Sequence, residues 1–362
     1  GVPVPFFGRK YPHIAVGVGC SYGCDFCSPS HFFGRRHITF YTRGRQLFDE
    51  MIRVKRRCGN NLITFVGDDN FLIDLDRAEE LRQCVVESGE MFSIFLFGSA
   101  DRVVQFGAER LAEMGVELIW IGRESELSDY PKNRNVNFKE VVADLRKYGI
   151  KTILSSILLL EEHTQENIME DIEAHLACAP VFSQFSHYSP VPGTPLFERL
   201  EKESRILHSI PLEEWHAFKQ PWFVHPHFNL VEAEKIQETA YRRDFLELGP
   251  SYLRWAAAEL EGWRTMKGSN KPHLRRRSAN IAARMWKYKV LLKAVEHLAP
   301  TEHIRLMART LLDEMGKDFG PPNPLQRCAA QGLHVSGRIR ELRTALWGDA
   351  IQPPTKLVTY NQ

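Results

Sequence analysis

The sequence predicts an α/β fold followed by a mainly helical C-terminal region. Over residues 11 to about 200, short segments rich in Ile, Leu, Val or Phe alternate about six times with longer amphipathic segments. After Pro195 the strand-like segments stop, and residues 211 to about 316 have helical periodicity. Repeated strand-helix alternation favours a parallel sheet that is either open or curled into a partial barrel.

The expected strands are short and apolar throughout, as strands buried on both faces are. They span residues 13–18, 62–66, 92–97, 117–121, 152–159 and 182–186. Between several of them, apolar residues recur every three or four positions, which predicts helices that pack one face on the sheet, over residues 75–85, 138–148 and 168–176. Asn137 and Glu140 have the spacing of a capping box at the start of the second of these. Beyond the strands, apolar stripes predict a helix over 281–295 and a short one near 335–346.

Composition narrows the class of protein. The chain has 362 residues with 47 basic and 45 acidic side chains, so its net charge of +2 gives no reason to expect a nucleic-acid partner. With 43% hydrophobic and 25% charged residues it is neither disordered nor collagen-like. The best candidate for a spanning segment, 153–160, is interrupted by Ser155 and Ser156 and is far shorter than the roughly 20 residues that cross a bilayer. The first ten residues lack a visible secretory signal.

Three of the seven cysteines lie within eight residues of each other, at Cys20, Cys24 and Cys27. The other four are scattered singly, which does not suit a disulfide-stapled secreted domain and favours the cytoplasm. Three thiolates without a paired partner motif suit a 4Fe-4S cluster that leaves one iron open. There are two alternatives. The three cysteines could bind structural zinc with His31 or His37 as the fourth ligand, or they could be loop cysteines that bind no metal.

This cysteine motif resembles the radical S-adenosylmethionine (SAM) superfamily. The spacing Cys-x3-Cys-x2-Cys, with Phe26 just before the last cysteine, follows the first of six strand-helix units. The resemblance covers about residues 11–205 and implies a partial (β/α)6 TIM-like barrel with its site at the carboxyl ends of the strands. It also implies that the open iron binds SAM and that reduction cleaves SAM to a 5′-deoxyadenosyl radical.

Further segments match the superfamily at the ends of later strands. Gly67, Asp68 and Asp69 stand where the family holds the SAM amino group, although both aspartates also suit a polar turn. Glu124 and Ser125 resemble the segment near the SAM ribose, with an ordinary ion pair to Arg123 or Lys132 as the alternative for Glu124. The resemblance also implies SAM contacts from Ser156 on strand five and from Val191 after strand six. It further implies that the backbone of Phe26, next to the last cysteine, contacts the adenine.

Strand five departs from the family pattern because no glycine occurs from Ser156 to Thr164. His163 in this stretch is a candidate proton donor, although a histidine just before a helix more often has a capping or surface role.

The Pro-Gly-Thr-Pro-Leu turn at 192–196 resembles the branch of the superfamily that carries a cobalamin-binding domain before the barrel. No cobalamin signature occurs in the chain, and its abrupt start without Met favours a fragment of a longer enzyme. We therefore expect a linker or leader at 1–10, a radical SAM barrel at 11–205 and a helical region at 206–362. The cofactors that the resemblance implies are a 4Fe-4S cluster, SAM and, in this branch, cobalamin.

The expected function is that of a radical SAM enzyme that methylates or rearranges an unactivated carbon. The resemblance implies a small-molecule or lipid substrate and a reductant such as flavodoxin or ferredoxin. A methylthiotransferase, which needs a second cluster, and a zinc-stabilised module without catalysis are the alternatives. Basic residues over 271–289, near three tryptophans, suit a solvated helix face, or else a basic surface for an anionic lipid interface or a phosphate-bearing substrate.

Overall fold

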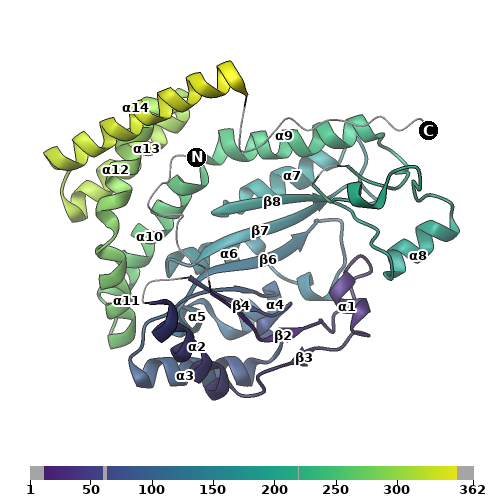
Figure 1. Cartoon of the computed structure of the whole chain (residues 1–362), viewed down its shortest axis with the longest axis horizontal. Coiled ribbons are helices and arrows are strands. Elements are labelled where there is room, and N and C mark those ends of the chain that lie inside the picture. Colours follow the sequence, from purple (N-terminus) through teal and green to yellow (C-terminus); the bar gives the residue numbers. More distant parts are fainter. Residues whose placement is uncertain (1–11, 60–62, 219, 349–362) are drawn as a thin grey trace.

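The computed structural model describes residues 12–59, 63–218 and 220–348. In these residues six strands form one parallel sheet in which the strand order follows the chain. The strands are β1 (His13–Ala15), β4 (Ile63–Gly67), β5 (Ser93–Phe97), β6 (Val116–Glu124), β7 (Lys151–Leu158) and β8 (Phe182–His187). Strands β1 and β8 are the two edges, so the sheet is an open, partial barrel (Figure 1). The predicted α/β class is confirmed, whereas the expected linker at 1–10 lies outside the described residues.

The first expected strand is in fact two. Strand β1 pairs with β4, whereas β2 (Gly17–Val18) turns away and pairs antiparallel with β3 (Ile38–Thr39). This small ribbon carries the chain from the sheet into the cysteine loop and then into α1 (Ser28–Phe32).

Helices connect the strands as the apolar periodicity predicts. They are α2 (Gly44–Cys58), α3 (Leu75–Ser88), α4 (Ala100–Phe106), α5 (Ala108–Met114), α6 (Phe138–Lys147), α7 (Ile168–Ala177) and, after β8, α8 (Pro195–Lys202). The Asn137 side chain accepts the Glu140 N–H at the start of α6, as the capping spacing predicts. Each helix places its apolar stripe in the core; in α6 this stripe includes Val141, Val142 and Leu145.

Alternation along the strands separates two layers. Ile119 and Ile121 of β6 are fully buried in the main hydrophobic core, whereas Trp120 between them faces the barrel interior. Inside, the Phe65 ring stacks on Phe95 at 4.9 Å between centroids, and Phe97 meets Trp120 edge-on at 5.3 Å. These rings fill the middle of the barrel, so the open space lies at the carboxyl ends of the strands.

The predicted helical region consists of α9 (Leu230–Leu248), α10 (Ser251–Lys267), α11 (Pro272–Ala282), α12 (Met285–Leu298), α13 (Glu302–Phe319) and α14 (Pro324–Trp347). Helix α9 lies along β8, α10 packs on α6, and α11 packs on α5 (Figure 1). Helix α14 lies on α12, and its second half is the short helix expected near 335–346. None of the helices in the described ranges combines the length and the apolar character needed to cross a bilayer.

Three cations of the basic segment at 271–289 join the helical region to the barrel. Lys271 pairs with Glu109 and Glu113, and Arg277 donates to the Val116 carbonyl from a buried position. Arg284 pairs with Glu259 of α10 and Glu117 of β6. These three cations have internal partners, whereas Arg275 and Arg276 are exposed, so peripheral membrane contact through this segment stays a prediction.

Candidate cluster and cofactor site

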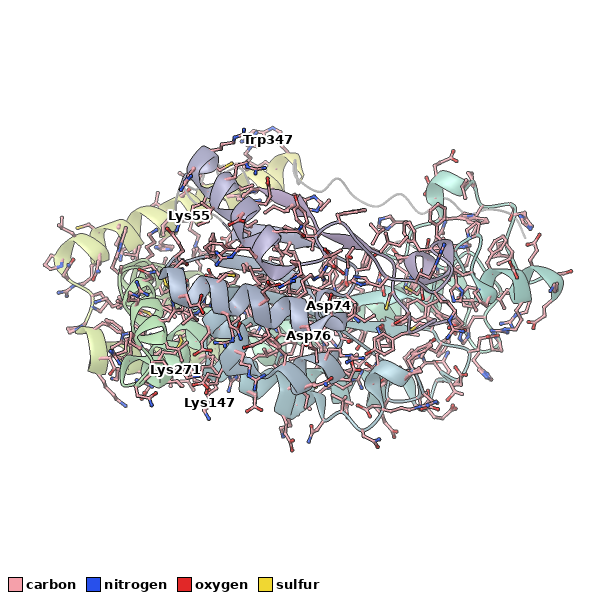
Figure 2. The ribbon with its side chains drawn as sticks, turned by 90° about the horizontal axis from the view of Figure 1, so that it is seen from below. Lys55, Asp74, Asp76, Lys147, Lys271 and Trp347 are labelled. Carbon is pink, nitrogen blue, oxygen red and sulfur yellow. The ribbon has the colours of Figure 1, made fainter. Side chains whose placement is uncertain are left out.

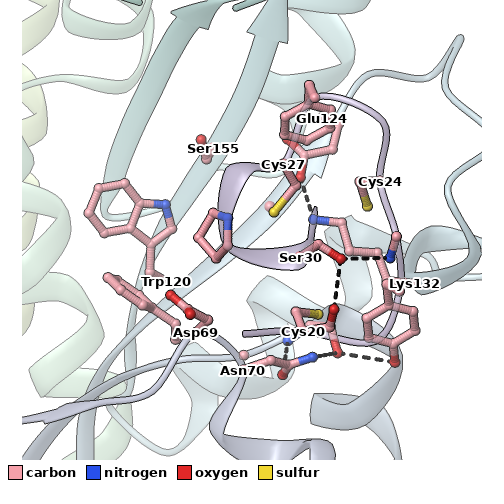
Figure 3. A pocket seen from close by; sticks show the side chains of 18 of the residues that line it. Cys20, Cys24, Cys27, Ser30, Asp69, Asn70, Trp120, Glu124, Lys132 and Ser155 are labelled. Atoms are coloured by element: carbon pink, nitrogen blue, oxygen red, sulfur yellow. Dashed lines mark hydrogen bonds and ion pairs between the residues drawn. The ribbon is translucent and has the colours of Figure 1, made fainter. Parts of the chain in front are cut away.

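The cysteine loop forms one wall of a cavity of about 470 Å³ at the carboxyl ends of the central strands. Cys20, Cys24 and Cys27 all line this cavity, as Figure 3 shows. Its volume lies within the range of small-molecule sites, and its position is the one at which enzymes built on such barrels bind their ligands.

Several polar contacts hold the loop in place. The Ser30 hydroxyl donates to the Cys20 carbonyl at 2.7 Å and accepts the Gly23 N–H at 3.0 Å. Asp69 accepts the Gly19 N–H at 2.6 Å, which connects the loop to the end of β4. Gly19 has φ +82°, and a Cβ there would lie 2.2 Å from the Arg36 carbonyl oxygen, so this position requires glycine.

The middle of the loop is connected to the opposite side of the barrel. Asp25 accepts hydrogen bonds from the hydroxyls of Tyr130 and Tyr188, each at 2.8 Å. Phe26 packs edge-on against the same two rings, at 5.3 and 6.2 Å between centroids. The cysteine loop is therefore positioned by residues more than 100 positions away in the sequence.

The thiols suit a metal cluster better than an isolated cysteine site. Cys24 is 5% exposed, and burial raises the pKa of its thiol to about 12. Burial also raises the pKa of Cys27. Thiols in this setting stay protonated unless metal coordination removes the proton, as ligation to a cationic iron centre does.

The histidines that a zinc site would need have other partners. His31 Nε2 bonds to the Cys24 carbonyl at 3.0 Å, and His37 Nε2 bonds to Asp68 at 2.8 Å. In residues 12–59, 63–218 and 220–348, no three Cys, His, Asp or Glu side chains converge as ligands of a single metal ion. Tetrahedral zinc requires such convergence, whereas a cluster takes each thiolate on a different iron. The donor set of three cysteines therefore fits a 4Fe-4S cluster with one iron free of protein ligands.

A second element of the cavity is the ion pair between Lys132 and Glu124. Glu124 ends β6 with φ +64°, and Lys132 comes from the short turn Pro131–Asn133. Burial disfavours the charged lysine, but the neighbouring Glu124 carboxylate outweighs it and raises the pKa of Lys132. Gly122 makes room for this pair, since a Cβ there would lie 2.3 Å from Glu124 Oε1. The structure therefore contains the Glu124–Lys132 ion pair, which the sequence analysis gave as the alternative to a SAM-binding role for Glu124.

Among the expected SAM-binding residues, Phe26, Asp69 and Glu124 line the cavity. Asp69 is exposed and directs its carboxylate to this space beside Asn70 (Figure 3). Together with Lys132, the two acids are the charged side chains of the cavity wall.

Gly67 and Asp68 do not reach the cavity, which corrects the expectation for both. The Asp68 side chain is fully buried and forms ion pairs with Arg77 at 2.9 Å and His37 at 2.8 Å. These partners hold the pKa of Asp68 below its usual range although burial works in the opposite direction. A Cβ on Gly67 would lie 2.1 Å from the His13 ring, so the glycine makes room for that ring.

Ser125, Ser156 and Val191 also lie outside the cavity lining. Ser156 is buried and bonds to Arg123 at 3.1 Å and His175 at 2.8 Å. Ser125 accepts the Leu127 N–H in a tight turn, and the Val191 carbonyl accepts from Thr194. These residues stabilise loops around the site, so the expectation that they contact SAM is not supported.

His163 is also part of this supporting structure. It is fully buried, accepts the Leu160 N–H at Nδ1 and bonds to Asp171 through Nε2 at 3.0 Å. His163 therefore has neither the helix-capping nor the surface role that the sequence offered, because the N-cap of α7 is Asn167 and the His163 ring is buried outside the cavity lining.

Sequence reasoning missed several cavity residues that stand one position from the expected ones. Asn70 lines the cavity one position after Asp69, and Ser155 lines it in place of Ser156. Other missed cavity residues include Tyr22, Phe97, Ser99, Trp120, Lys132, Ile157 and Ser186. The signal that could have found some of them is strand alternation, because Trp120, Gly122 and Glu124, and likewise Ser155 and Ile157, are spaced by two.

Comparison with known proteins agrees with this geometry. Residues 14–174 match the model of the Radical SAM superfamily. The chain is 25% identical over 244 residues to bacteriochlorophyllide d C-12(1)-methyltransferase of Chlorobaculum tepidum, covering 65% of this chain and 53% of that protein. It is 26% identical over 209 residues to hopanoid C-2 methylase of Rhodopseudomonas palustris, covering 54% and 38%.

A solved structure of the radical SAM methyltransferase TsrM from Kitasatospora setae, with tryptophan and a SAM analogue bound, aligns with a TM-score of 0.47 and 17% identity over 71% of this chain and 52% of that one. The chain spans about half the length, or less, of these relatives. The cysteine motif, its placement after the first strand of an open parallel barrel, and the family match identify residues 14–174 as a radical SAM domain.

Proposed function

We propose that this protein cleaves SAM reductively and uses the resulting radical chemistry to methylate an unactivated carbon of a small-molecule or lipid substrate. The proposal depends on one observation: three cysteine thiols and three charged side chains line the same cavity at the carboxyl ends of the strands. Relatives named as methyltransferases support the methyl-transfer part. In the proposal, cobalamin is the methyl carrier, as the resemblance of the turn at 192–196 suggests.

In the proposal, Cys20, Cys24 and Cys27 hold the cluster. A bound 4Fe-4S cluster with an open iron supplies the electron that breaks a carbon–sulfur bond of SAM. The loop contacts of Ser30, Asp25 and Asp69 keep the three thiols in position around it.

The charges of the cavity wall suit the zwitterionic amino-acid end of SAM. Asp69 offers a carboxylate to the SAM ammonium, and Lys132 offers an ammonium to the SAM carboxylate. Because Lys132 is already paired with Glu124, the incoming carboxylate joins or replaces that partner. The aromatic walls, Phe26 and Trp120, exclude water from the nucleoside end.

The test is anaerobic reconstitution with iron and sulfide, followed by dithionite and SAM, with 5′-deoxyadenosine measured by mass spectrometry. We expect product and about four irons per chain from the wild-type protein. Cys24→Ala abolishes both, whereas the matched control Cys58→Ala, at an exposed cysteine outside the cavity, retains both. Tightly bound zinc without iron, or equal activity in Cys24→Ala, contradicts the proposal.

The methyl-transfer part has its own measurement. S-adenosylhomocysteine is the coproduct when SAM gives up its methyl group, so its formation should require added cobalamin. Formation of 5′-deoxyadenosine with no cobalamin-dependent S-adenosylhomocysteine retains the radical chemistry and contradicts the role of cobalamin.

A further inference from the structure

Helix α14 has an outward apolar stripe opposite the face that packs on the protein. Val335, Ile339, Leu342 and Leu346 are spaced by four, three and four residues, which places them within about 60° of one another around the helix. They are 56, 61, 64 and 69% exposed. The stripe extends over about 17 Å of helix.

The packed face of α14 is a different set of residues. Ala330 is buried against Val290 and Ala294, and the His334 ring stacks on His297 at 5.3 Å between centroids. From Arg338 to Trp347 every residue is exposed, so this end of the helix projects beyond its support on α12. In Figure 2, Trp347 lies at the edge of the molecule, away from the basic segment that begins at Lys271.

Charge distinguishes between the possible occupants of the stripe. Arg338 and Arg343 flank the stripe on its two sides, and α14 as a whole carries four arginines and one glutamate. The spacing of the stripe also suits a two-stranded coiled coil, but in a parallel pair of copies Arg338 of one helix would face Arg343 of the other. Like charges at these positions oppose such a pair.

An anionic bilayer surface complements every part of this pattern. The apolar side chains would enter the boundary between lipid headgroups and acyl chains, and the flanking arginines would extend to the lipid phosphates. Tryptophan is enriched at the membrane–water interface, which suits the position of Trp347 at the end of the helix. We propose that α14 is a membrane-docking helix that holds the protein on anionic lipid through Val335, Ile339, Leu342, Leu346 and Trp347. The proposal is independent of the reaction proposed above, and it places the surface recognition on α14 and not on residues 271–289.

The experiment uses the full chain and flotation with vesicles of phosphatidylcholine alone or mixed equally with phosphatidylglycerol. We expect binding to the mixed vesicles that weakens at 0.5 M salt, and at least tenfold weaker partitioning of the double variant Ile339→Glu, Leu342→Glu. Val104→Glu is the matched control, since Val104 is 62% exposed on α4. Arg338→Gln with Arg343→Gln should remove most of the preference for the anionic vesicles.

Far-UV circular dichroism and a thermal melt establish that the variants are folded, which their exposed positions lead us to expect. A wild-type protein that stays unbound with anionic vesicles overturns the proposal, as does a glutamate double variant that binds like the wild type. A third outcome also overturns the proposal: the wild-type protein sediments as a dimer, the glutamate double variant sediments as a monomer, and neither binds vesicles. This result assigns the stripe to contact with a second copy of the chain. Because vesicle binding needs neither iron nor SAM, its outcome is separate from that of the reaction.

Discussion

Lys132 forms an ion pair with Glu124 beside the thiols of Cys24 and Cys27, although Lys132 is in a turn outside the cysteine motif. The pair places one positive charge at the inner wall of the cavity. A cation there has two uses: it offsets the negative charge of thiolate ligands, and it is a counter-charge for the carboxylate of an amino-acid ligand.

Replacing this cation is the first test of the site. In Lys132→Met we expect the Kd for SAM to rise about ten- to hundredfold, equivalent to about 1.4–2.7 kcal/mol, because the SAM carboxylate loses its partner. Lys132→Arg keeps the charge and should lose much less. Equilibrium binding of SAM and iron content are measured on both variants, and an unchanged Kd in Lys132→Met shows that the lysine serves only Glu124.

Changing Asp68 to asparagine should lower the stability of the protein, whereas changing its neighbour Asp69 to asparagine should weaken SAM binding. Asp68→Asn leaves Arg77 buried without its anionic partner, which lowers the free energy of unfolding by about 3 kcal/mol. Asp69→Asn keeps an oxygen that can accept the Gly19 N–H, so stability changes little, whereas loss of the negative charge weakens SAM binding. Urea unfolding and SAM binding on the same two proteins measure both effects. Equal stability of the two variants contradicts the assignment of Asp68 to the core.

Ser155 and Ser156 allow the same comparison on β7. Ser155→Val places a larger apolar group in the cavity wall and should weaken SAM binding without lowering the melting temperature by more than a few degrees. Ser156→Val leaves Arg123 and His175 without a buried hydrogen-bond partner, at a cost of about 1–3 kcal/mol. The prediction is wrong if Ser156→Val is the variant that loses SAM affinity while keeping full stability.

Two buried histidines make the stability depend on pH. Burial lowers the pKa of His175 to about 3 and that of His187 to about 4, from an ordinary value of 6.5. Below pH 6.5 the unfolded chain therefore binds protons that the folded chain does not, so the free energy of unfolding falls as the pH decreases towards 4. The slope approaches about 1.4 kcal/mol per pH unit for each histidine.

Urea unfolding at pH 7, 6, 5 and 4.5 measures this slope. His175→Gln and His187→Gln should each reduce it. If the double variant His175→Gln, His187→Gln loses stability with decreasing pH as steeply as the wild type does, the prediction is wrong and other groups cause the acid sensitivity.

The sequence by itself determined the alternation of strands and helices, the change to helices after the barrel and the three cysteines of the site. Each of these depends on local information: apolar periodicity sets the elements, and the motif lies within a single loop. For the same reason the capping contact between Asn137 and Glu140 could be predicted.

Only the tertiary structure decided which of two neighbouring residues faces the cavity. A shift of one position turns a strand side chain to the other face, so Ser155 and Ser156 cannot be distinguished without the register of the sheet. Contacts between distant segments decided the rest. Asp25 meets Tyr188 across 163 positions, and the outward stripe of α14 becomes visible only when its other face is seen packed on α12.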